Sequence, residues 1–257
     1  MTGTGRTAAT KRVPMNSLRK TALIAGAFYL ITIFVSIPAL VLKGPVLSNP
    51  GYILGPGPDT AVIWAGLLDV IAALACIGTA VVLFPVVKRQ NEAAALGFAA
   101  ARVLEAAIIV VGVVSLLSIV TLRQDLAGAG GAEAASLATT GRSLVAFHNW
   151  TFLLGPGIIP ALNALLLGYL MYRSGLVPRV IPLVGLIGAP LLLASAAATL
   201  FGINDQISVW SAIAGIPMLI WEFSLGSWLV VKGFKPSPIT AGEVAAGTPA
   251  AYRDVDA

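Results

Sequence analysis

Apolar residues gather into six long runs along the chain, separated by short stretches of polar and turn-forming residues. A helix of about 20 mostly apolar residues crosses the hydrocarbon core of a bilayer, and each run is long enough to do so. The runs cover residues 20–42, 61–87, 93–121, 144–171, 180–201 and 209–231. The pattern therefore predicts an all-α, polytopic integral membrane bundle of six transmembrane helices.

The composition and the ends of the chain agree with this prediction. Charged residues make up 11% of the chain and the mean hydropathy is +0.92, whereas about 25% of residues are charged in a soluble domain. Residues 1–18 and 236–257 are rich in Thr, Ala, Gly and Pro, which predicts disordered tails on either side of a membrane domain at 19–235. The first run is longer than the core of a signal peptide, so we expect it to be retained as a helix.

Basic residues are distributed unevenly between the two sets of connections. Twelve Lys and Arg flank the runs on one side of the predicted bundle, and three lie on the other. Because basic residues collect on the cytoplasmic side of membrane proteins, this bias predicts that both termini are cytoplasmic. It also accounts for the net charge of +5 without a nucleic-acid partner, so the expected partner is the lipid bilayer.

Glycine and proline punctuate two connections and one run. The connection at about 43–60 is rich in both, but it keeps apolar residues that are expected to pack at the mouth of the bundle: Val46, Leu47, Tyr52, Ile53 and Leu54. The connection at about 122–143 is rich in Ala and Gly and is expected to be mobile. The fourth run contains Gly155-Pro156-Gly157, which is typical either of a broken helix that lines a cavity or of an ordinary proline kink.

Four ionisable side chains lie inside the apolar runs: Asp69, Arg102, Glu105 and Glu222. An ionised Asp or Arg at the centre of a membrane helix costs roughly 2.5–3.5 kcal/mol, so we expect all four to face the protein interior. Arg102 and Glu105 are three residues apart and can touch on one helix face. Counting about 1.5 Å per residue places all four near the midplane of the bilayer.

These four groups comprise three acids and one guanidinium, so their formal charge is minus two if all are ionised. Because a dry interior does not hold that charge, either one or two acids are protonated or a cation or cationic ligand is bound. Two interpretations stay open at this point. The charges form a salt-bridge network around Arg102 that only fixes helix packing, or they form a site that binds protons or a ligand.

The chain has one histidine, His148, and one cysteine, Cys76. His148 lies near the start of the fourth run, where it belongs to an interfacial aromatic belt or contacts a proton or ligand above the acids. Cys76 is expected to be a small packing residue, and Asn163 is expected to hydrogen-bond between helices. Because no zinc-ligand spacing and no catalytic or phosphate-binding motif is present, we predict no metal site, no cofactor and no catalytic residue.

Several short motifs together resemble one known family. They are Arg19-Lys20 before the first run, Phe84-Pro85 at the end of the second, Arg102-Val103-Leu104-Glu105 in the third, Tyr172-Arg173-Ser174-Gly175-Leu176-Val177-Pro178-Arg179 between the fourth and fifth, Trp221-Glu222 in the sixth and Val231-Lys232-Gly233-Phe234 after it. Over about residues 17–235 the chain resembles the bacterial six-span membrane proteins grouped as domain of unknown function 4386, except that Asp69 stands where Glu is expected in relatives. The resemblance implies a six-span topology in a bacterial cytoplasmic (inner) membrane and no particular activity.

The sequence leaves three kinds of function open. The first is a small-solute or ion-handling, proton-linked membrane protein, in which Asp69, Glu105 and Glu222 exchange protons or bind a small cationic or polar ligand near Arg102. The second is a non-catalytic structural or regulatory membrane module that stabilises a partner, and the third is a membrane enzyme that acts on a lipid. The residues indicate neither a particular partner protein nor a homo-oligomer.

Overall fold

The computed structural model describes residues 17–49, 51–55, 57–128 and 130–241, and within these ranges its regular structure is helical, without a strand. The helices are α1 Ser17–Ser48, α2 Asp59–Val87, α3 Glu92–Asp125, α4 Gly131–Leu154, α5 Ile159–Ser174, α6 Val180–Leu200, α7 Val209–Val231 and the short 3₁₀ helix η1 Pro238–Thr240. Six segments are long and apolar enough to cross a membrane, with α4 and α5 together forming one of them. The predicted all-α bundle of six membrane helices is confirmed, while tail residues 1–16 and 242–257 lie outside the described residues.

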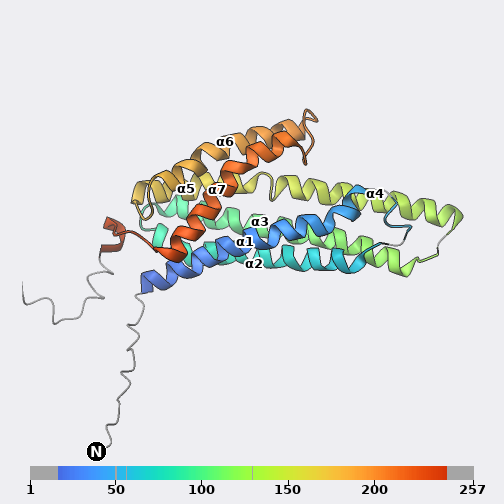
Figure 1. Ribbon diagram of the computed structural model, residues 1–257, viewed down its shortest axis with the longest axis horizontal. Helices are drawn as coiled ribbons and strands as arrows, with labels where there is room; N and C mark the ends of the chain where they lie inside the picture. The colour runs from blue at the N-terminus through green and yellow to red at the C-terminus, as the bar shows by residue number, and fades with distance from the viewer. Residues whose placement is uncertain (1–16, 50, 56, 129, 242–257) are drawn as a thin grey trace, which may run out of the picture.

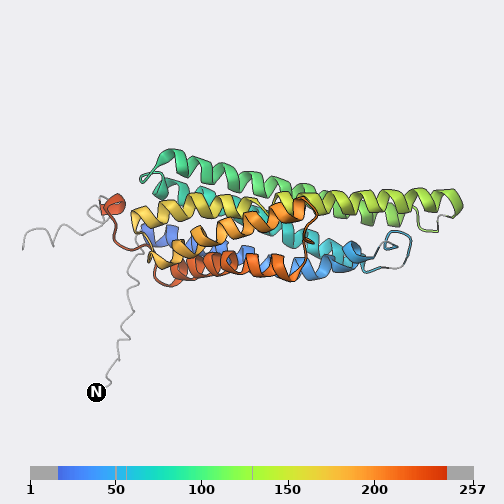
Figure 2. The same cartoon turned by 90° about the horizontal axis from the view of Figure 1, so that it is seen from above.

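The six spans form a ring in which each packs against its neighbours. Helix α1 contacts α2 and α7, α2 contacts α3, α3 contacts α4 and α5, α5 contacts α6, and α6 contacts α7. The first residue of α1 and the last residue of α7 lie at the same end of the bundle, which we call the terminal end (Figures 1 and 2). The opposite end, which α3 and α4 reach, is called the far end.

Close packing joins α1 to α7 near the terminal end. A Cβ atom on Gly26 would lie 2.6 Å from the carbonyl oxygen of Gly226, so the two helices touch backbone to backbone. Arg19 then donates hydrogen bonds to the carbonyl oxygens of Leu229 and Val230, at 2.9 and 2.6 Å. Since the last carbonyls of a helix lack partners within it, Arg19 caps α7 and ties it to α1.

The connection predicted to be mobile is mostly helical instead. Helix α3 continues to Asp125, and α4 begins at Gly131 rather than at residue 144. The physical reason is its alanine content, because alanine has the highest helix propensity and here outweighs the scattered glycines. The structure also decides between the two interpretations of Gly155-Pro156-Gly157, since α4 ends at Leu154 and α5 begins at Ile159, which makes a break in the helix.

The helices differ in length, and this difference fixes how the bundle fits a bilayer. Helices α6 and α7 have 21 and 23 residues, or about 32–35 Å, close to the thickness of one hydrocarbon core. Helices α1 and α3 have 32 and 34 residues, and Figures 1 and 2 show the α6–α7 hairpin stopping well short of the far end. We therefore expect the far ends of α1 to α4 to project beyond the bilayer.

The connection between α1 and α2 packs onto this projecting part. Tyr52 and Ile53 are each 3% exposed, as predicted, whereas Leu54 is 50% exposed and does not pack as expected. Burial raises the pKa of Tyr52 to about 12, so its hydroxyl stays protonated and donates to Asp59 at 3.0 Å. Arg123 of α3 also donates to Asp59 and lies over the Tyr52 ring, which holds the connection against α3.

Part of the predicted C-terminal tail is ordered. The Ser237 hydroxyl donates to the carbonyl oxygen of Ser174 at 2.6 Å, and the Lys235 amide donates to Leu176 at 2.8 Å. Thr240 of η1 is buried. Residues 236–241 therefore pack against the α5–α6 connection, and at the other end of the chain residues 17–18 already belong to α1.

Candidate functional site

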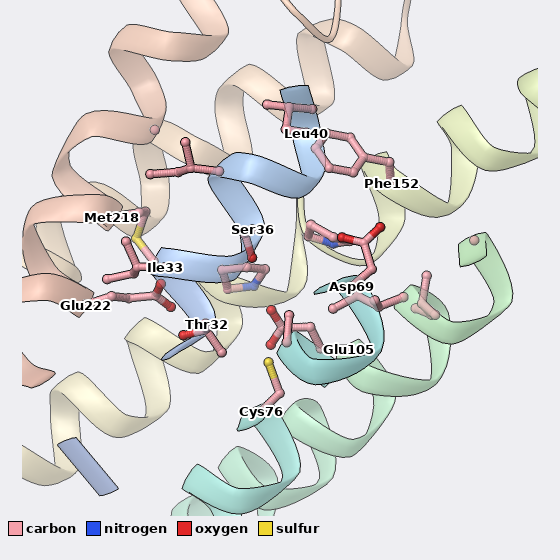
Figure 3. A pocket seen from close by; sticks show the side chains of 18 of the residues that line it. Thr32, Ile33, Ser36, Leu40, Asp69, Cys76, Glu105, Phe152, Met218 and Glu222 are labelled. Carbon is pink, nitrogen blue, oxygen red and sulfur yellow. The ribbon is translucent and has the colours of Figure 1, made fainter. Parts of the chain in front are cut away.

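A cavity of about 330 Å³ lies among the six spans. Every residue singled out from the sequence as a candidate site residue lines it: Asp69, Arg102, Glu105, His148 and Glu222. They come from α2, α3, α4 and α7, and most of the remaining wall is apolar. Figure 3 shows Glu222 on one side of the cavity and Asp69 on the other, with Ser36 of α1 between them.

Arg102 and Glu105 of α3 form the core of one charged group. Arg102 donates to the Glu105 carboxylate at 3.1 Å, and Asn163 of α5 donates to the same oxygen at 2.7 Å. Arg102 also lies over the Tyr29 ring of α1 and donates to Cys76 of α2. The predicted interhelical role of Asn163 is confirmed, and four helices meet at this ion pair, which is the kind of contact that fixes helix register.

Glu222 of α7 completes this group but is held more loosely. Its carboxylate lies 3.5 Å from Arg102, and its side chain is 20% exposed, against 6% for that of Glu105. Arg102 is thus shared by two acids, of which Glu105 has two close donors and Glu222 has one distant donor. We call Arg102, Glu105, Asn163 and Glu222 the deep group.

A second charged group contains a residue that the sequence interpretation missed. Lys43 of α1 is buried and donates to Asp69 at 2.6 Å, although the sequence pattern places it in the connection beyond the first run. The signal was helical spacing, because Ser36 lies four residues after Thr32 and Lys43 lies seven residues after Ser36, which puts all three on one helix face. The sequence pattern misses Lys43 because Gly44-Pro45 is typical of a helix end, whereas α1 continues through Pro45 to Ser48.

His148 of α4 lies beside this pair and has a defined tautomer. Its Nδ1 is 3.1 Å from the carbonyl oxygen of Gly112, and since a carbonyl can only accept, Nδ1 carries the proton. The ring stacks on the Phe152 ring, and Nζ of Lys43 lies 5.5 Å from the centre of the Phe152 ring. His148 is 3% exposed, so it lies inside the bundle rather than in an exposed aromatic belt. We call Lys43, Asp69 and His148 the far group.

The two groups lie at different distances from the terminal end of the bundle, although the sequence predicts that all four charges lie near the midplane. Counting about 1.5 Å per residue from the terminal ends of their helices, Arg102 and Glu222 lie about 14–15 Å deep and Asp69 about 27 Å deep. Helix α2 has 29 residues and is longer than the bilayer core, so its own length could not fix the depth of Asp69. The shorter α6 and α7 are close to the thickness of one hydrocarbon core, and from their lengths we expect the far group to lie nearer the far surface of the bilayer.

Three buried polar atoms of the site have no hydrogen-bond partner within the described part of the chain. They are Nε of Arg102, Nε2 of His148 and Oδ1 of Asn163. Because Nδ1 of His148 carries the proton, its Nε2 offers a free lone pair beside the cavity, whereas Oδ1 of Asn163 is a free acceptor on a residue that does not line the cavity. A buried polar atom without a partner costs about 1–3 kcal/mol, so a bound molecule or water that supplies the missing hydrogen bond would be stabilised. Among the same residues no group of three His, Cys, Asp or Glu could hold a metal ion.

Comparison with known proteins places the chain at the level of a family. The family described as Domain of unknown function (DUF4386) matches residues 24–233, from α1 to just beyond α7. No curated protein and no solved structure matches the chain. The resemblance predicted from the sequence motifs is confirmed.

Proposed function

The chain belongs to the DUF4386 family of membrane proteins, and from its cavity we propose that it binds a small cationic solute inside the membrane and exchanges it for a proton at Glu222. The observation that carries this proposal is the unequal sharing of Arg102, which leaves Glu222 with one donor at 3.5 Å and a side chain open to the cavity. Glu222 is therefore the most open of the three acids that line the cavity.

The charges that line the cavity support an exchange. Lys43 and Arg102 face Asp69, Glu105 and Glu222, so the formal charge is minus one when all five are ionised and His148 is neutral. Lys43 neutralises Asp69 and Arg102 neutralises Glu105, each through a short contact. A single negative charge at Glu222 remains, and in a largely apolar cavity it is balanced by a proton or by a cation but not by both.

A structural role is favoured for the other half of the deep group. Glu105 accepts from Arg102 and Asn163 through one carboxylate oxygen, and its side chain is only 6% exposed, so it links α3 to α5 and is less accessible to a ligand than Glu222. This part of the site fits the alternative of a module whose charges fix helix packing. The two interpretations left open by the sequence therefore apply to different acids.

The proposal is tested with cations that have no proton of their own to release. Purified protein in nanodiscs is titrated with tetramethylammonium or decyltrimethylammonium in weakly buffered solution from about pH 5 to 8, and a pH indicator follows proton release. We expect at least one cation to release protons from the wild type and not from Glu222→Gln. The matched control is Asp205→Asn, which removes an exposed acid of the α6–α7 connection outside the cavity.

Two results would contradict the proposal. One is the absence of proton release by either cation across the whole pH range. The other is release from Glu222→Gln that equals release from the wild type, which would place the titrating group elsewhere. Empty nanodiscs provide the baseline for cations that simply partition into lipid.

A further inference from the structure

We infer that the solute is a membrane-dissolved amphiphile, with a single apolar chain and a cationic head, that enters the cavity sideways from the bilayer between α1 and α7. This inference rests on the proposed function, because it specifies which cation reaches Glu222 and by which route. It is carried by the geometry of the α1–α7 contact, which is closed in one half and open in the other.

The same two helices that touch near the terminal end separate further along. A Cβ atom on Gly226 would lie 3.1 Å from Tyr29, and one on Gly26 would meet the α7 backbone. Eleven residues before Gly226 on α7, a Cβ atom on Gly215 would meet nothing within 4 Å, although Gly215 lines the cavity. The cavity therefore has a mouth at this point, between the far halves of α1 and α7.

The mouth is apolar and faces outward from the ring. Ile37 and Leu40 of α1 and Leu219 of α7 line the cavity and yet are 56%, 38% and 46% exposed. Gly215 lies about 24 Å from the terminal end of α7, within a helix about 35 Å long. A mouth at that depth opens into lipid rather than water, and its apolar rim is compatible with an alkyl chain but not with a hydrated ion.

The interior offers a path from this mouth to the charge. Gly215, Met218 and Glu222 follow one another on the cavity side of α7, over about 10 Å of helix. On the α1 side Thr32 and Ser36, which both carry hydroxyls, also line the cavity, and Figure 3 shows Ser36 between Glu222 and Asp69. A cationic head that reaches Glu222 past these hydroxyls leaves its apolar chain along the wall and in the mouth.

The size of the cavity favours a molecule with one chain. Its volume of about 330 Å³ lies at the lower end of the range for small-molecule sites, roughly 300–1,000 Å³. A two-chain phospholipid exceeds that volume, whereas a single-chain amine or quaternary ammonium compound fits with part of its chain in the mouth. Charge selects within this class, because an anionic head would add to the negative charge at Glu222.

The two quaternary cations introduced above separate this inference from the function on which it rests, since they share a head and differ in the chain. We expect decyltrimethylammonium to release protons from the wild type, and tetramethylammonium to bind at least about tenfold more weakly in the same assay, which corresponds to about 1.4 kcal/mol. Gly215→Leu places a side chain in the mouth and is expected to weaken the binding of decyltrimethylammonium by at least the same factor. Leu40→Trp narrows the mouth from the α1 side and should act in the same direction.

The control for the plugged mouth is Gly44→Leu. Gly44 is also a helical glycine with open space around its Cβ position, but it does not line the cavity. Both glycine substitutions should raise helix propensity rather than disturb the fold, and thermal unfolding of each variant verifies this. Gly44→Leu should bind like the wild type.

Each outcome then bears on a different statement. If tetramethylammonium acts as strongly as decyltrimethylammonium, entry from the bilayer is wrong while the exchange at Glu222 stands. If decyltrimethylammonium acts equally on the wild type, Gly215→Leu and Leu40→Trp, the mouth between α1 and α7 is not the route. If neither cation releases protons, the proposed function itself fails.

Discussion

The deep group and the far group solve the problem of a buried charge in different ways. In the far group one cation meets one acid, Lys43 and Asp69, at 2.6 Å. In the deep group one cation meets two acids, and Arg102 contacts Glu105 at 3.1 Å but Glu222 at 3.5 Å. A balanced pair has no charge to exchange, whereas the unbalanced group contains an acid whose partner is left to the ligand or the proton.

Burial separates the same residues in a second way. The side chains of Arg102 and Glu105 are 2% and 6% exposed, while those of Asp69 and Glu222 are 12% and 20% exposed. The cost of removing one partner of an ion pair grows as the remaining charge is cut off from solvent. The comparison therefore predicts an order of stability losses, which begins at Arg102 and ends at Glu222.

Arg102→Met should have the largest effect. It leaves Glu105 with Asn163 as its remaining donor inside the bundle, and breaking a buried pair in this way costs about 3–5 kcal/mol. The free energy of unfolding in detergent, measured with a chemical denaturant, checks this. The matched control is Arg142→Met, an exposed arginine of α4, whose loss should change stability by less than about 0.5 kcal/mol. Equal effects of the two substitutions would mean that Arg102 contributes no more to stability than an exposed arginine does.

Lys43→Met should cost less, about 1–3 kcal/mol. Asp69 is left without its cation, but its side chain is 12% exposed, against 6% for that of Glu105. Because the pair is one-to-one, adding Asp69→Leu should restore most of the lost stability. The corresponding double variant Arg102→Met with Glu105→Leu should recover less, since Glu222 and Asn163 keep polar groups in place. A double-mutant cycle measures both couplings, and similar recovery in the two groups would contradict the distinction between them.

How far the sequence leads can be judged on these same residues. The charges inside apolar runs predicted that Asp69, Arg102, Glu105 and Glu222 face the interior, because lipid makes any other position too costly. That argument gives the face of each helix that turns inward, but not which helix packs against it. The pairing of Glu105 with Asn163 on α5 is therefore known only from the structure. The split into two depths also depended on tertiary structure, because a long helix such as α2 can be matched to the bilayer in several ways.

The residue that the sequence missed shows where local rules fail. Gly44-Pro45 reads as the end of a helix, but proline inside a membrane helix is tolerated when neighbouring helices supply packing. Helix α1 therefore continues to Ser48 and brings Lys43 onto Asp69. Conversely, the six spans follow from hydropathy alone and are present in the structure. At Gly155-Pro156-Gly157 the sequence marked the place but left a break and a kink open, and the structure shows the break.

His148→Phe should cost about 1 kcal/mol, the contribution of one ordinary hydrogen bond. The phenyl ring keeps the stacking on Phe152 but cannot donate to the Gly112 carbonyl. His148→Asn should stay closer to the wild type, because its amide nitrogen can replace Nδ1 as the donor. Thermal unfolding of both variants tests this, and a loss in His148→Asn as large as in His148→Phe would mean that ring packing, not the hydrogen bond, holds α4 against α3.

Glu222→Gln should change stability least, by no more than about 0.5 kcal/mol in either direction. Its carboxylate has one donor at 3.5 Å, so neutralising it removes little attraction and relieves the competition of two acids for Arg102. Glu105→Gln is the matched variant, with the same chemical change on an acid that accepts from Arg102 and Asn163, and it should cost about 1–3 kcal/mol. Unfolding of the two variants is compared in one detergent and at one pH.

Residues at functional sites are often kept at no benefit to stability. An unchanged stability of Glu222→Gln beside a loss in Glu105→Gln would therefore mean that Glu105 fixes helix packing and Glu222 serves the exchange. Equal losses would mean that both acids serve the fold.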